Sequence, residues 1–315
     1  MNDTRTRLRY LDETLRLLYP GSGAPEAYTL LPHARLPRRL TPRRWWHRAL
    51  GRRVPLPGEG SIGAYLSEVF GCPIETVLHV RPARRANRKP ILETHSDGRL
   101  LAFVKVGDTD PARELVAHEA ATLRRLAGLP LKTIVAPTVL HHGSWRGLSV
   151  LALSPLPVRR GLRVSALSAL PVRRGRVPGS LLTAAVREIA ATGGDGGHAW
   201  HGDLSPWNIS PAADGRLLVW DWERYEVGVP YGFDALHHLL QRALLRMDPP
   251  TAARACLAQA LPALAPLGLS AAQARQTALR YLIALADRHF ADGHEPLGPP
   301  SHWLNPLVDH QELLP

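Results

Sequence analysis

The sequence has few residues of the kinds that mark secreted, membrane-spanning or zinc-finger proteins. Only two cysteines occur among 315 residues, Cys72 and Cys256, and their separation matches no metal-ligand spacing. Two cysteines give no disulfide framework, so we expect a reducing, cytoplasmic environment. No stretch approaches the roughly 20 apolar residues that span a bilayer, and MNDTRTRLRYLDETLRLL lacks the continuous apolar core of a secretory leader. We therefore expect no membrane partner.

Lysine is also scarce, and this scarcity affects how the charge of the chain is interpreted. Of the 39 basic residues only three are lysines (Lys89, Lys105 and Lys132), so the other 36 are arginines. A net charge of +12 and a pI near 10.6 favour anionic partners, nucleic acid among them. Abundant alanine, leucine, proline and glycine indicate a GC-rich coding bias equally well. Charge alone therefore does not make nucleic acid the expected partner.

The order of hydrophobic patterns predicts the fold class. Three short runs between residues 75 and 106 favour β-strands, TVLHV, PILETHS and LLAFVKV. A helical pattern follows with Asp110 as its expected N-cap, and TVLHHGSWRG and LSVLALS then favour two more strands. Helical patterns dominate the second half, at about 180–193, 232–246, 250–263 and 270–290, the last one capped by Ser270. We expect an α+β fold, with a five-stranded antiparallel sheet and one helix followed by a mainly helical part.

The first 74 residues are interpreted as a basic N-terminal extension. Residues 1–60 carry twelve arginines against five acidic residues, and a helix is expected near 8–18. The extension could wrap onto the main fold through its aromatic residues, or it could be an anion-binding arm. The sheet part is then expected to span residues 75–156, and the helical part residues 157–315.

Two short patterns in the connecting segments need a local interpretation. GEGSIG matches G-x-G-x-x-G but follows no predicted strand, so we interpret Ser61 as the N-cap of a short helix. LSPLPVRRG at residues 153–161 recurs as LSALPVRRG at 167–175. One pair of copies is too little for a stacked repeat, and we interpret it as a local duplication between the two parts.

The segment HGDLSPWN carries the residues best suited to catalysis. Asp203 and Asn208 bracket a short loop that contains Pro206, and Asp221, in VWDWE, lies thirteen residues after Asn208. Asn208 and Asp221 offer the hard oxygen ligands that Mg²⁺ prefers. Asp203, left free, could accept the proton of an attacking hydroxyl. A proton acceptor and two metal ligands are the smallest set of groups needed for phosphoryl transfer, in which positioning and charge stabilisation supply most of the catalysis.

The pattern H-G-D-x-x-x-x-N followed by D-x-E resembles the aminoglycoside phosphotransferase/choline kinase-like family, a branch of the protein-kinase-like fold. Lys105 in the third predicted strand and Glu119, fourteen residues later on the next helix, agree with this resemblance. It covers about residues 75–300 and leaves the extension unexplained. It implies a bilobal protein-kinase-like fold, ATP and Mg²⁺ as cofactors, and a small molecule with a hydroxyl group as phosphate acceptor.

Position by position, the resemblance implies Asp203 as the catalytic base and Asn208 and Asp221 as the Mg²⁺ ligands. Lys105 would bind the nucleotide phosphates and be held by Glu119. Glu114 is the alternative partner of the lysine, but it lies outside the helical stripe that contains Glu119. The adenine would lie against the connection that includes Ser154 and Leu156.

The resemblance also implies which residues hold the catalytic loop in place and which contact the phosphate acceptor. His201 would tie the catalytic loop to the metal-binding segment. Asp234 resembles a buried aspartate that braces the catalytic loop, and a plain charge at a helix N-terminus is the equal alternative. The pair His237–His238 lacks a third ligand at metal spacing, so we interpret both as core or surface histidines. Acceptor contacts would come from three further residues, Glu223, Tyr225 and Tyr231.

The basic hairpin RPARRANRKP departs from the glycine-rich loop that covers nucleotides in protein kinases. Without glycine, backbone amides cannot approach phosphates as closely, but cationic side chains can reach them. Position 205 is serine, so the catalytic loop offers no cation either. We hypothesise that Arg84, Arg88 or Lys89 contacts the β- or γ-phosphate. The alternative is a solvated hairpin tip.

These features together predict an ATP- and Mg²⁺-dependent phosphotransferase acting on a small molecule such as an antibiotic, sugar or nucleoside. From Glu223 to the C-terminus nine acidic residues stand against seven arginines, which favours a neutral or amphipathic acceptor over a polycationic one. The alternative is a nucleotide-binding protein that is non-catalytic, or that acts on a protein or nucleic-acid partner through its basic arm. The sequence gives no indication of the oligomeric state.

Overall fold

The structure is a computed structural model that describes residues 3–20, 38–40, 59–80, 88–157, 177–293 and 295–309. The described chain divides into two compact units. The first unit holds the described residues up to Ala120 together with Thr138–Pro155, and the second holds Ala121–Pro137 and the described residues from Leu156 onward. Arg84 and most of the duplicated segment lie outside the described residues.

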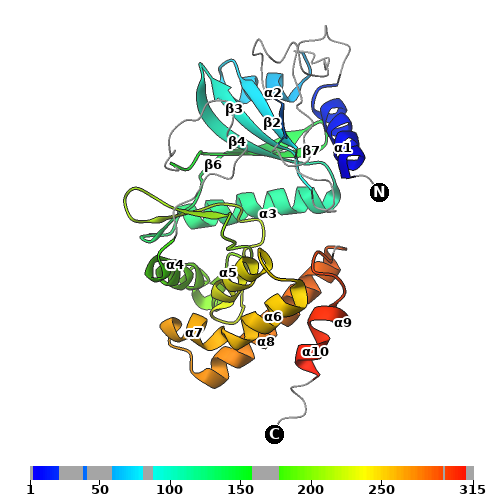
Figure 1. Ribbon diagram of the computed structural model, residues 1–315. Coiled ribbons are helices and arrows are strands. Elements are labelled where there is room, and N and C mark those ends of the chain that lie inside the picture. Colours follow the sequence, from blue (N-terminus) through cyan, green and yellow to red (C-terminus); the bar gives the residue numbers. More distant parts are fainter. Residues whose placement is uncertain are drawn as a thin grey trace. The chain divides into compact units, whose positions relative to one another are not determined.

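The first unit is built on an antiparallel sheet with the strand order β1-β2-β3-β4-β7-β6 (Figure 1). Every neighbouring pair is antiparallel. The five strands predicted from the sequence are confirmed, and β1, from the N-terminal extension, adds a sixth at the edge beside β2. The strands are β1 (Arg38–Leu40), β2 (Glu75–Val80), β3 (Ile91–Ser96), β4 (Arg99–Gly107), β6 (Val139–Trp145) and β7 (Leu148–Leu153).

Three helices accompany this sheet: α1 (Asp3–Leu18), α2 (Ile62–Phe70) and α3 (Asp110–Ala127). The predicted cap of α2 is confirmed, because the Ser61 side chain accepts a hydrogen bond of 3.2 Å from the N–H of Ala64. The cap predicted for α3 is wrong by one residue. The hydroxyl of Thr109, not the carboxylate of Asp110, accepts a hydrogen bond of 3.4 Å from Ala112 N–H. Both hydroxyl groups satisfy N–H groups that a helix start leaves without an intrahelical acceptor.

The alternation of side chains along β4 gives the sheet two different faces. Val104 and Val106 are fully buried and join a core cluster with α1 and α2, to which Leu15, Leu18, Ile62, Leu66 and Leu92 also belong. Lys105, between the two valines, must point to the opposite face, because successive strand residues alternate. Its side chain reaches α3 there. Figure 1 shows α3 on the side of the sheet away from α1 and α2.

The end of β4 lies unusually close to the start of α3. A Cβ atom at Gly107 would lie 2.8 Å from the backbone of Ala112 and of Arg113. Real Cβ atoms essentially never approach backbone this closely, so any side chain here would push the helix start away from the strand. Glycine at position 107 therefore sets the distance between the strand that carries Lys105 and the helix that carries Glu119.

The second unit is mainly helical. Two short sheets, β5-β10-β9 and β11-β8, lie among the helices and contain β5 (Ile134–Val135), β8 (Ala199–Trp200), β9 (Ile209–Pro211), β10 (Leu217–Val219) and β11 (Glu226–Val227). The helices are α4 (Gly179–Ala191), α5 (Phe233–Leu244), α6 (Pro249–Ala258), α7 (Ala260–Leu264), α8 (Ala271–Ala291), α9 (Pro300–Trp303) and α10 (Asn305–Val308), with 3₁₀ turns η2 (Gly194–Gly196) and η3 (Ala265–Leu267). Buried side chains of α5 and α8 form much of the core, among them Leu236, Leu240, Leu282 and Leu285.

Helix boundaries in this unit follow local chemistry. The expected cap of α8 is confirmed, because Ser270 and Gln273 form a reciprocal capping box. The single helix predicted at about 250–263 is wrong, since the chain breaks at Gln259 into α6 and α7. Pro262 explains the break, because it has no N–H to donate to the carbonyl four residues earlier and its ring clashes with that carbonyl.

The elements give the α+β class that the sequence predicted. An antiparallel sheet with α3 on one face makes the first unit, and helices dominate the second. None of the described helices combines the length and the apolar character that crossing a bilayer requires.

We expect Gly107→Ala to destabilise the protein, because the added methyl group collides with backbone atoms that cannot rotate away. Overpacking of this kind costs about 1–3 kcal/mol. Urea unfolding followed by circular dichroism measures the loss. Gly179→Ala is the matched control: no atom lies within 4 Å of its added Cβ, so the unfolding free energy should change by less than about 0.5 kcal/mol. Equal stability of the two variants would contradict the close contact of β4 with α3.

Candidate active site

In the first unit the candidate site is a buried ion pair. The Nζ of Lys105 lies 2.7 Å from Oε1 and 2.6 Å from Oε2 of Glu119. Glu119 is fully buried and Lys105 is 8% exposed. Glu114, the alternative partner, is exposed on α3. Burying two charges is favourable only when they pair closely, so each of these side chains depends on the other.

The connection that follows β7 is held by two hydrogen bonds. Ser154 N–H donates to the Thr138 carbonyl at 2.9 Å, and the Ser154 hydroxyl accepts from Thr138 N–H at 2.9 Å. Ser154 and Leu156 are both partly buried. This segment is the one expected to contact the adenine, and the two bonds position its first residue.

Of the cationic residues in the basic hairpin, the structure describes Arg88 and Lys89. The guanidinium of Arg88 lies 3.1 Å from the carboxylate of Glu13 and 4.2 Å from the ring centre of Tyr10, both on α1. Lys89 follows and is partly buried. The hypothesis that Arg84, Arg88 or Lys89 contacts phosphate did not include these contacts of Arg88 with the N-terminal extension. Arg84, the third candidate, lies outside the described residues.

In the second unit, the loop predicted to be catalytic, residues 201–208, follows β8, and its second residue is a glycine in a conformation that leaves no room for a side chain. Gly202 has a φ of +81°, and a Cβ atom there would lie 2.0 Å from the Arg224 carbonyl oxygen. The loop then folds on itself, because Ser205 N–H donates to the Asp203 carbonyl at 2.7 Å and Asn208 N–H donates to the Ser205 carbonyl at 2.9 Å. These contacts hold the Asp203 side chain in one place.

The Asp203 carboxylate accepts hydrogen bonds from three side chains. The Ser205 hydroxyl and His237 Nε2, at 2.9 Å, donate to Oδ1, while the Asn208 amide donates to Oδ2 at 2.9 Å. Burial raises the pKa of Asp203, but the hydrogen bond from His237, helped by the one from Ser205, lowers that pKa below its usual value. Asp203 is therefore ionised at neutral pH. Its side chain keeps 30% of its surface exposed, so a substrate can reach it.

A hairpin of β9 and β10 brings the two expected metal ligands to one end. Ile209 pairs with Val219, and Trp220 N–H donates to the Asn208 carbonyl at 3.1 Å, so Trp220 lies opposite Asn208 and Asp221 is the next residue along the chain. The Asn208 amide nitrogen donates to Asp203, which leaves its Oδ1 atom as the possible cation ligand. Asp221 has a φ of +75°, a conformation that non-glycine residues adopt rarely and mostly at functional sites.

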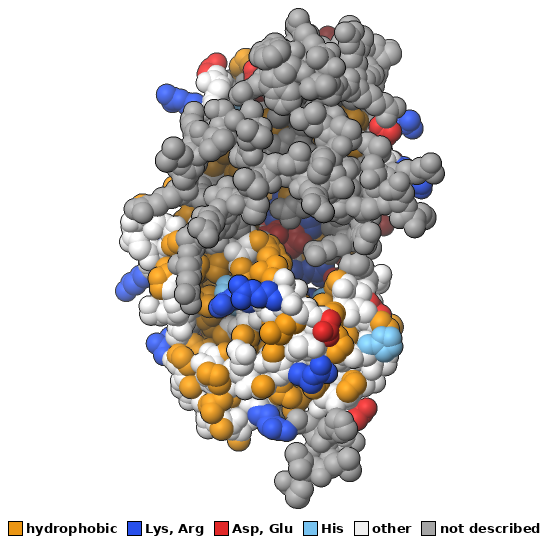
Figure 2. Space-filling view, viewed as in Figure 1, with side chains coloured by type: hydrophobic (Ala, Val, Ile, Leu, Met, Phe, Trp, Pro, Cys, Tyr) orange, Lys and Arg blue, Asp and Glu red, His pale blue; other side chains and the backbone are white. Residues whose placement is uncertain are grey.

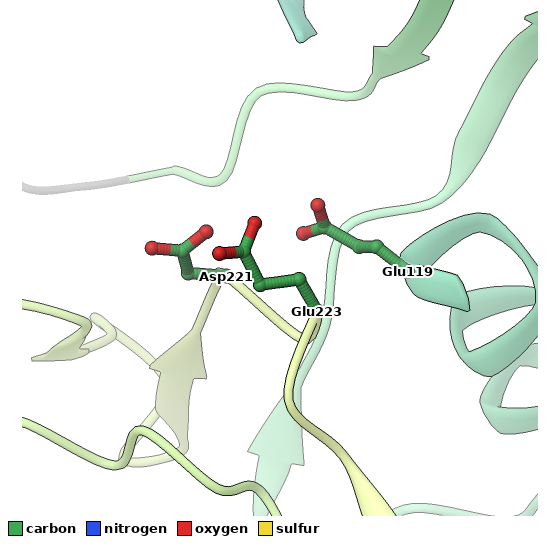
Figure 3. A group of neighbouring side chains, drawn as sticks. All are labelled: Glu119, Asp221 and Glu223. Atoms are coloured by element: carbon green, nitrogen blue, oxygen red, sulfur yellow. The ribbon is translucent and has the colours of Figure 1, made fainter. Parts of the chain in front are cut away.

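Glu223 lies close to Asp221 on the segment after β10. Carboxylate oxygens of these two residues lie within 4.8 Å of each other. Figure 3 shows the side chains of Asp221 and Glu223 on this segment. Two carboxylates this close repel each other unless a cation or donors lie between them. Carboxylate oxygens are hard ligands of the kind that Mg²⁺ prefers.

Below the catalytic loop, His201 and Asp234 are both buried. His201 N–H donates to Asp234 Oδ2 at 2.8 Å, and His201 Nδ1 accepts from Asp203 N–H at 3.1 Å. The His201 ring packs against Trp222, next to Asp221, with ring centres 4.5 Å apart. Burial lowers the pKa of His201 to about 4 and raises the pKa of Asp234 to about 7. Asp234 therefore contacts the loop directly and is more than a helix N-terminal charge.

Three further residues at the catalytic loop were not predicted from the sequence. His237 contacts Asp203, Tyr281 contacts His237 at 3.0 Å, and Arg288 donates to the Gly202 carbonyl at 2.6 Å. The sequence interpretation of His237 as a core or surface histidine missed its contact with Asp203. Helical spacing carried a signal, since residues three apart, or seven apart, share one helix face. Asp234 and His237 are three apart, and Tyr281 and Arg288 are seven apart.

The residues expected on the acceptor side differ in exposure. Tyr225 is buried, and its hydroxyl bonds to the Thr192 hydroxyl at 2.9 Å, which points to a structural part. Tyr231 is partly buried and packs on the His198 ring with centres 4.7 Å apart. Glu223 is also partly buried. Glu223 and Tyr231 thus remain the better placed candidates for contact with a substrate.

No protein-family model matches the chain, and no curated protein matches it. Among solved structures, a presumed fructosamine-3-kinase from Haemophilus somnus 129PT is similar over 73% of this chain and 90% of its own, with 14% identity and a TM-score of 0.43. The bifunctional kinase-methyltransferase WbdD matches over 62% of this chain and 42% of its own, with 15% identity and a TM-score of 0.32. This chain thus spans less than half of WbdD.

The kinase domain of PknI from Mycobacterium tuberculosis is similar over 67% of this chain and 95% of its own, with 14% identity and a TM-score of 0.33. Similarities of this size assign no residue and no substrate. The fold class therefore rests on the strand order and the helices of the chain itself, and the candidate site rests on its own contacts.

Proposed function

We propose that the protein is an ATP- and Mg²⁺-dependent phosphotransferase that transfers the γ-phosphoryl group to a hydroxyl of a small molecule. The observation that carries this proposal is the Asp203 carboxylate, which is ionised, partly exposed and fixed by three donors. A protein that only binds a nucleotide needs no such base. The proposal agrees with the resemblance to the aminoglycoside phosphotransferase/choline kinase-like family.

Asp203 is proposed as the catalytic base. The oxygen of the acceptor hydroxyl forms a bond to the γ-phosphorus, the bond from that phosphorus to the β-γ bridging oxygen breaks, and its electron pair leaves with ADP. The hydroxyl proton moves to Asp203. Proton transfer to a positioned base contributes about 10²–10⁴-fold to such reactions.

Asn208 and Asp221 are proposed as Mg²⁺ ligands, through the amide oxygen and the carboxylate. The bound ion would neutralise charge on the phosphate oxygens. Lys105, held by Glu119, is proposed to bind the nucleotide phosphates from the first unit. The carboxylate of Glu119 lies within hydrogen-bond distance of the Lys105 ammonium group and would hold it in a fixed position.

The acceptor is proposed to be a neutral or amphipathic molecule. On the face of the second unit seen in Figure 2, Lys and Arg side chains lie scattered among hydrophobic ones, and acidic side chains are few. The large apolar side chains exposed on the described part of this unit include Leu245, Met247, Leu261, Ile283 and Phe290. A polycationic acceptor would instead favour an acidic surface.

We expect Asp203→Ala to lower kcat for ATP consumption by about 10²–10⁴-fold, because it removes the proton acceptor. A panel of sugars, nucleosides and hydroxylated antibiotics, with ADP release as the readout, first identifies an acceptor for the wild type. Asp214→Ala is the control, since Asp214 is an exposed aspartate bonded to Arg216 in the turn between β9 and β10. Wild-type turnover by Asp203→Ala would remove the catalytic assignment.

Lys105→Met should raise the KM for ATP by at least about ten-fold, because a charge-assisted bond contributes about 1.5–3 kcal/mol. It also leaves Glu119 buried without its partner, which costs about 3–5 kcal/mol of folding stability. The double variant Lys105→Met/Glu119→Gln removes that charge and keeps the protein folded for the measurement. Lys132→Met is the control for loss of a lysine. An unchanged KM in the folded double variant would contradict phosphate binding by Lys105.

Magnesium should increase the stabilisation of the protein by ATP. At a nucleotide concentration of 100 times Kd, binding adds about 2.7 kcal/mol, seen as a higher Tm. In Asp221→Ala the part of this increase that requires Mg²⁺ should disappear, whereas Asp287→Ala, an exposed site on α8, should keep it. Absence of any Mg²⁺-dependent rise in the wild type, together with salt-sensitive binding to random DNA that ignores Asp203, would favour a nucleic-acid partner instead.

A further inference from the structure

His237 connects the catalytic loop to the helical core of the second unit. It lies on α5, one turn after Asp234, and is 1% exposed. Its Nε2 atom lies 2.9 Å from Asp203 Oδ1, and its Nδ1 atom lies 3.0 Å from the Tyr281 hydroxyl on α8. The Nε2 atom also lies 3.3 Å from the Ser205 hydroxyl, so both ring nitrogens of this buried histidine have hydrogen-bond partners.

The chemistry of the partners determines the direction of both hydrogen bonds. An ionised carboxylate can only accept, so His237 Nε2 must carry the proton. Burial lowers the pKa of His237 and raises the pKa of Tyr281 well above its usual value, so the imidazole is neutral and the phenol keeps its proton. A neutral imidazole with a proton on Nε2 must accept at Nδ1, and Tyr281 donates to it.

These bonds leave the two oxygens of Asp203 in different states. Oδ1 accepts from Ser205 and from His237, which occupies both of its lone pairs. Oδ2 accepts from the Asn208 amide alone. One lone pair of Oδ2 is therefore open among the contacts of the described residues. This is the position at which Asp203 can take a proton.

We propose that His237, oriented by Tyr281, is the positioning residue of the catalytic base: it holds Asp203 by Oδ1 so that Oδ2 receives the proton of the acceptor hydroxyl. The inference rests on the proposed phosphotransfer function. His237 keeps its own proton throughout, since the hydroxyl proton ends on Oδ2 and the electron pair of the broken bond leaves with ADP. Arg288, which donates to the Gly202 carbonyl, discourages a second positive charge at His237.

The test compares kcat and KM of the full chain for MgATP, with water as the acceptor and phosphate release as the readout. His237→Leu should lower kcat about 10- to 100-fold, the cost of a displaced catalytic group, and leave the ATP KM within about two-fold. His237→Gln keeps an N–H donor at similar reach and should recover most of the loss. A merely structural role would not produce this split between kcat and KM, nor the rescue by glutamine.

His238→Leu is the matched control. His238 is the next residue on α5 and is 7% exposed, and its Nδ1 atom bonds to the Leu204 carbonyl at 3.1 Å instead of to Asp203. It should lose at most about three-fold in kcat. Equal losses in the His237→Leu and His238→Leu variants would overturn the inference, because the effect would then be that of any buried histidine on this helix.

A second measurement does not depend on turnover. In wild-type protein labelled with [¹⁵N]histidine, the His237 signals, assigned by their loss in His237→Gln, should show a proton on Nε2 and none on Nδ1. A proton on Nδ1 would overturn the inference while leaving the proposed function intact. Wild-type phosphate release no faster than that of Asp203→Ala, with water and with the acceptor panel, would overturn both.

Discussion

The catalytic loop depends on how two carboxylates are accommodated at the edge of an apolar helical core. Asp234 is 2% exposed and Asp203 is partly exposed, and the charge of Asp203 is one cause, after burial, of the raised pKa of Asp234. Polar groups removed from water are costly unless they are hydrogen-bonded, and a like charge nearby increases that cost. The loop and α5 supply the hydrogen-bond donors. His201 N–H donates to Asp234, and the side chains of Asn208 in the loop and His237 on α5 donate to Asp203.

This requirement for donors determines much of the surrounding structure. His201 can donate to Asp234 only because Gly202 turns the chain with a positive φ and passes close to the Arg224 carbonyl. The carbonyl of Gly202, in turn, is satisfied by Arg288 from α8. Removal of any one partner leaves a buried group without a hydrogen bond, at a cost of about 1–3 kcal/mol. The loop, α5 and α8 therefore hold one another in place.

The sequence predicted those features that depend on residues close together in the chain. Strand alternation around Lys105, the serine caps at Ser61 and Ser270, and the loop from Asp203 to Asn208 are all local patterns. Features that depend on distant partners could not be obtained in this way. Arg88 is bonded to Glu13, 75 residues away, and a cluster of basic residues does not indicate which anion it meets. His237 and Tyr281 are 44 residues apart, and only the packing of α5 against α8 brings them together.

The ion pair of Lys105 and Glu119 joins two different elements, and yet the sequence predicted it. For the pair to form, Lys105 must lie on the face of β4 that is turned toward α3, and Glu119 on the face of α3 that is turned toward the sheet. Each face can be predicted from the local pattern of apolar residues, which repeats every 2.0 residues in a strand and every 3.6 residues in a helix. A buried ion pair is often no more stabilising than a well-packed apolar pair of the same volume. A contribution to folding stability therefore does not explain why an ion pair lies on the face of β4 opposite Val104 and Val106. A lysine bonded to a buried carboxylate in the first unit agrees instead with the proposed binding of nucleotide phosphates by Lys105.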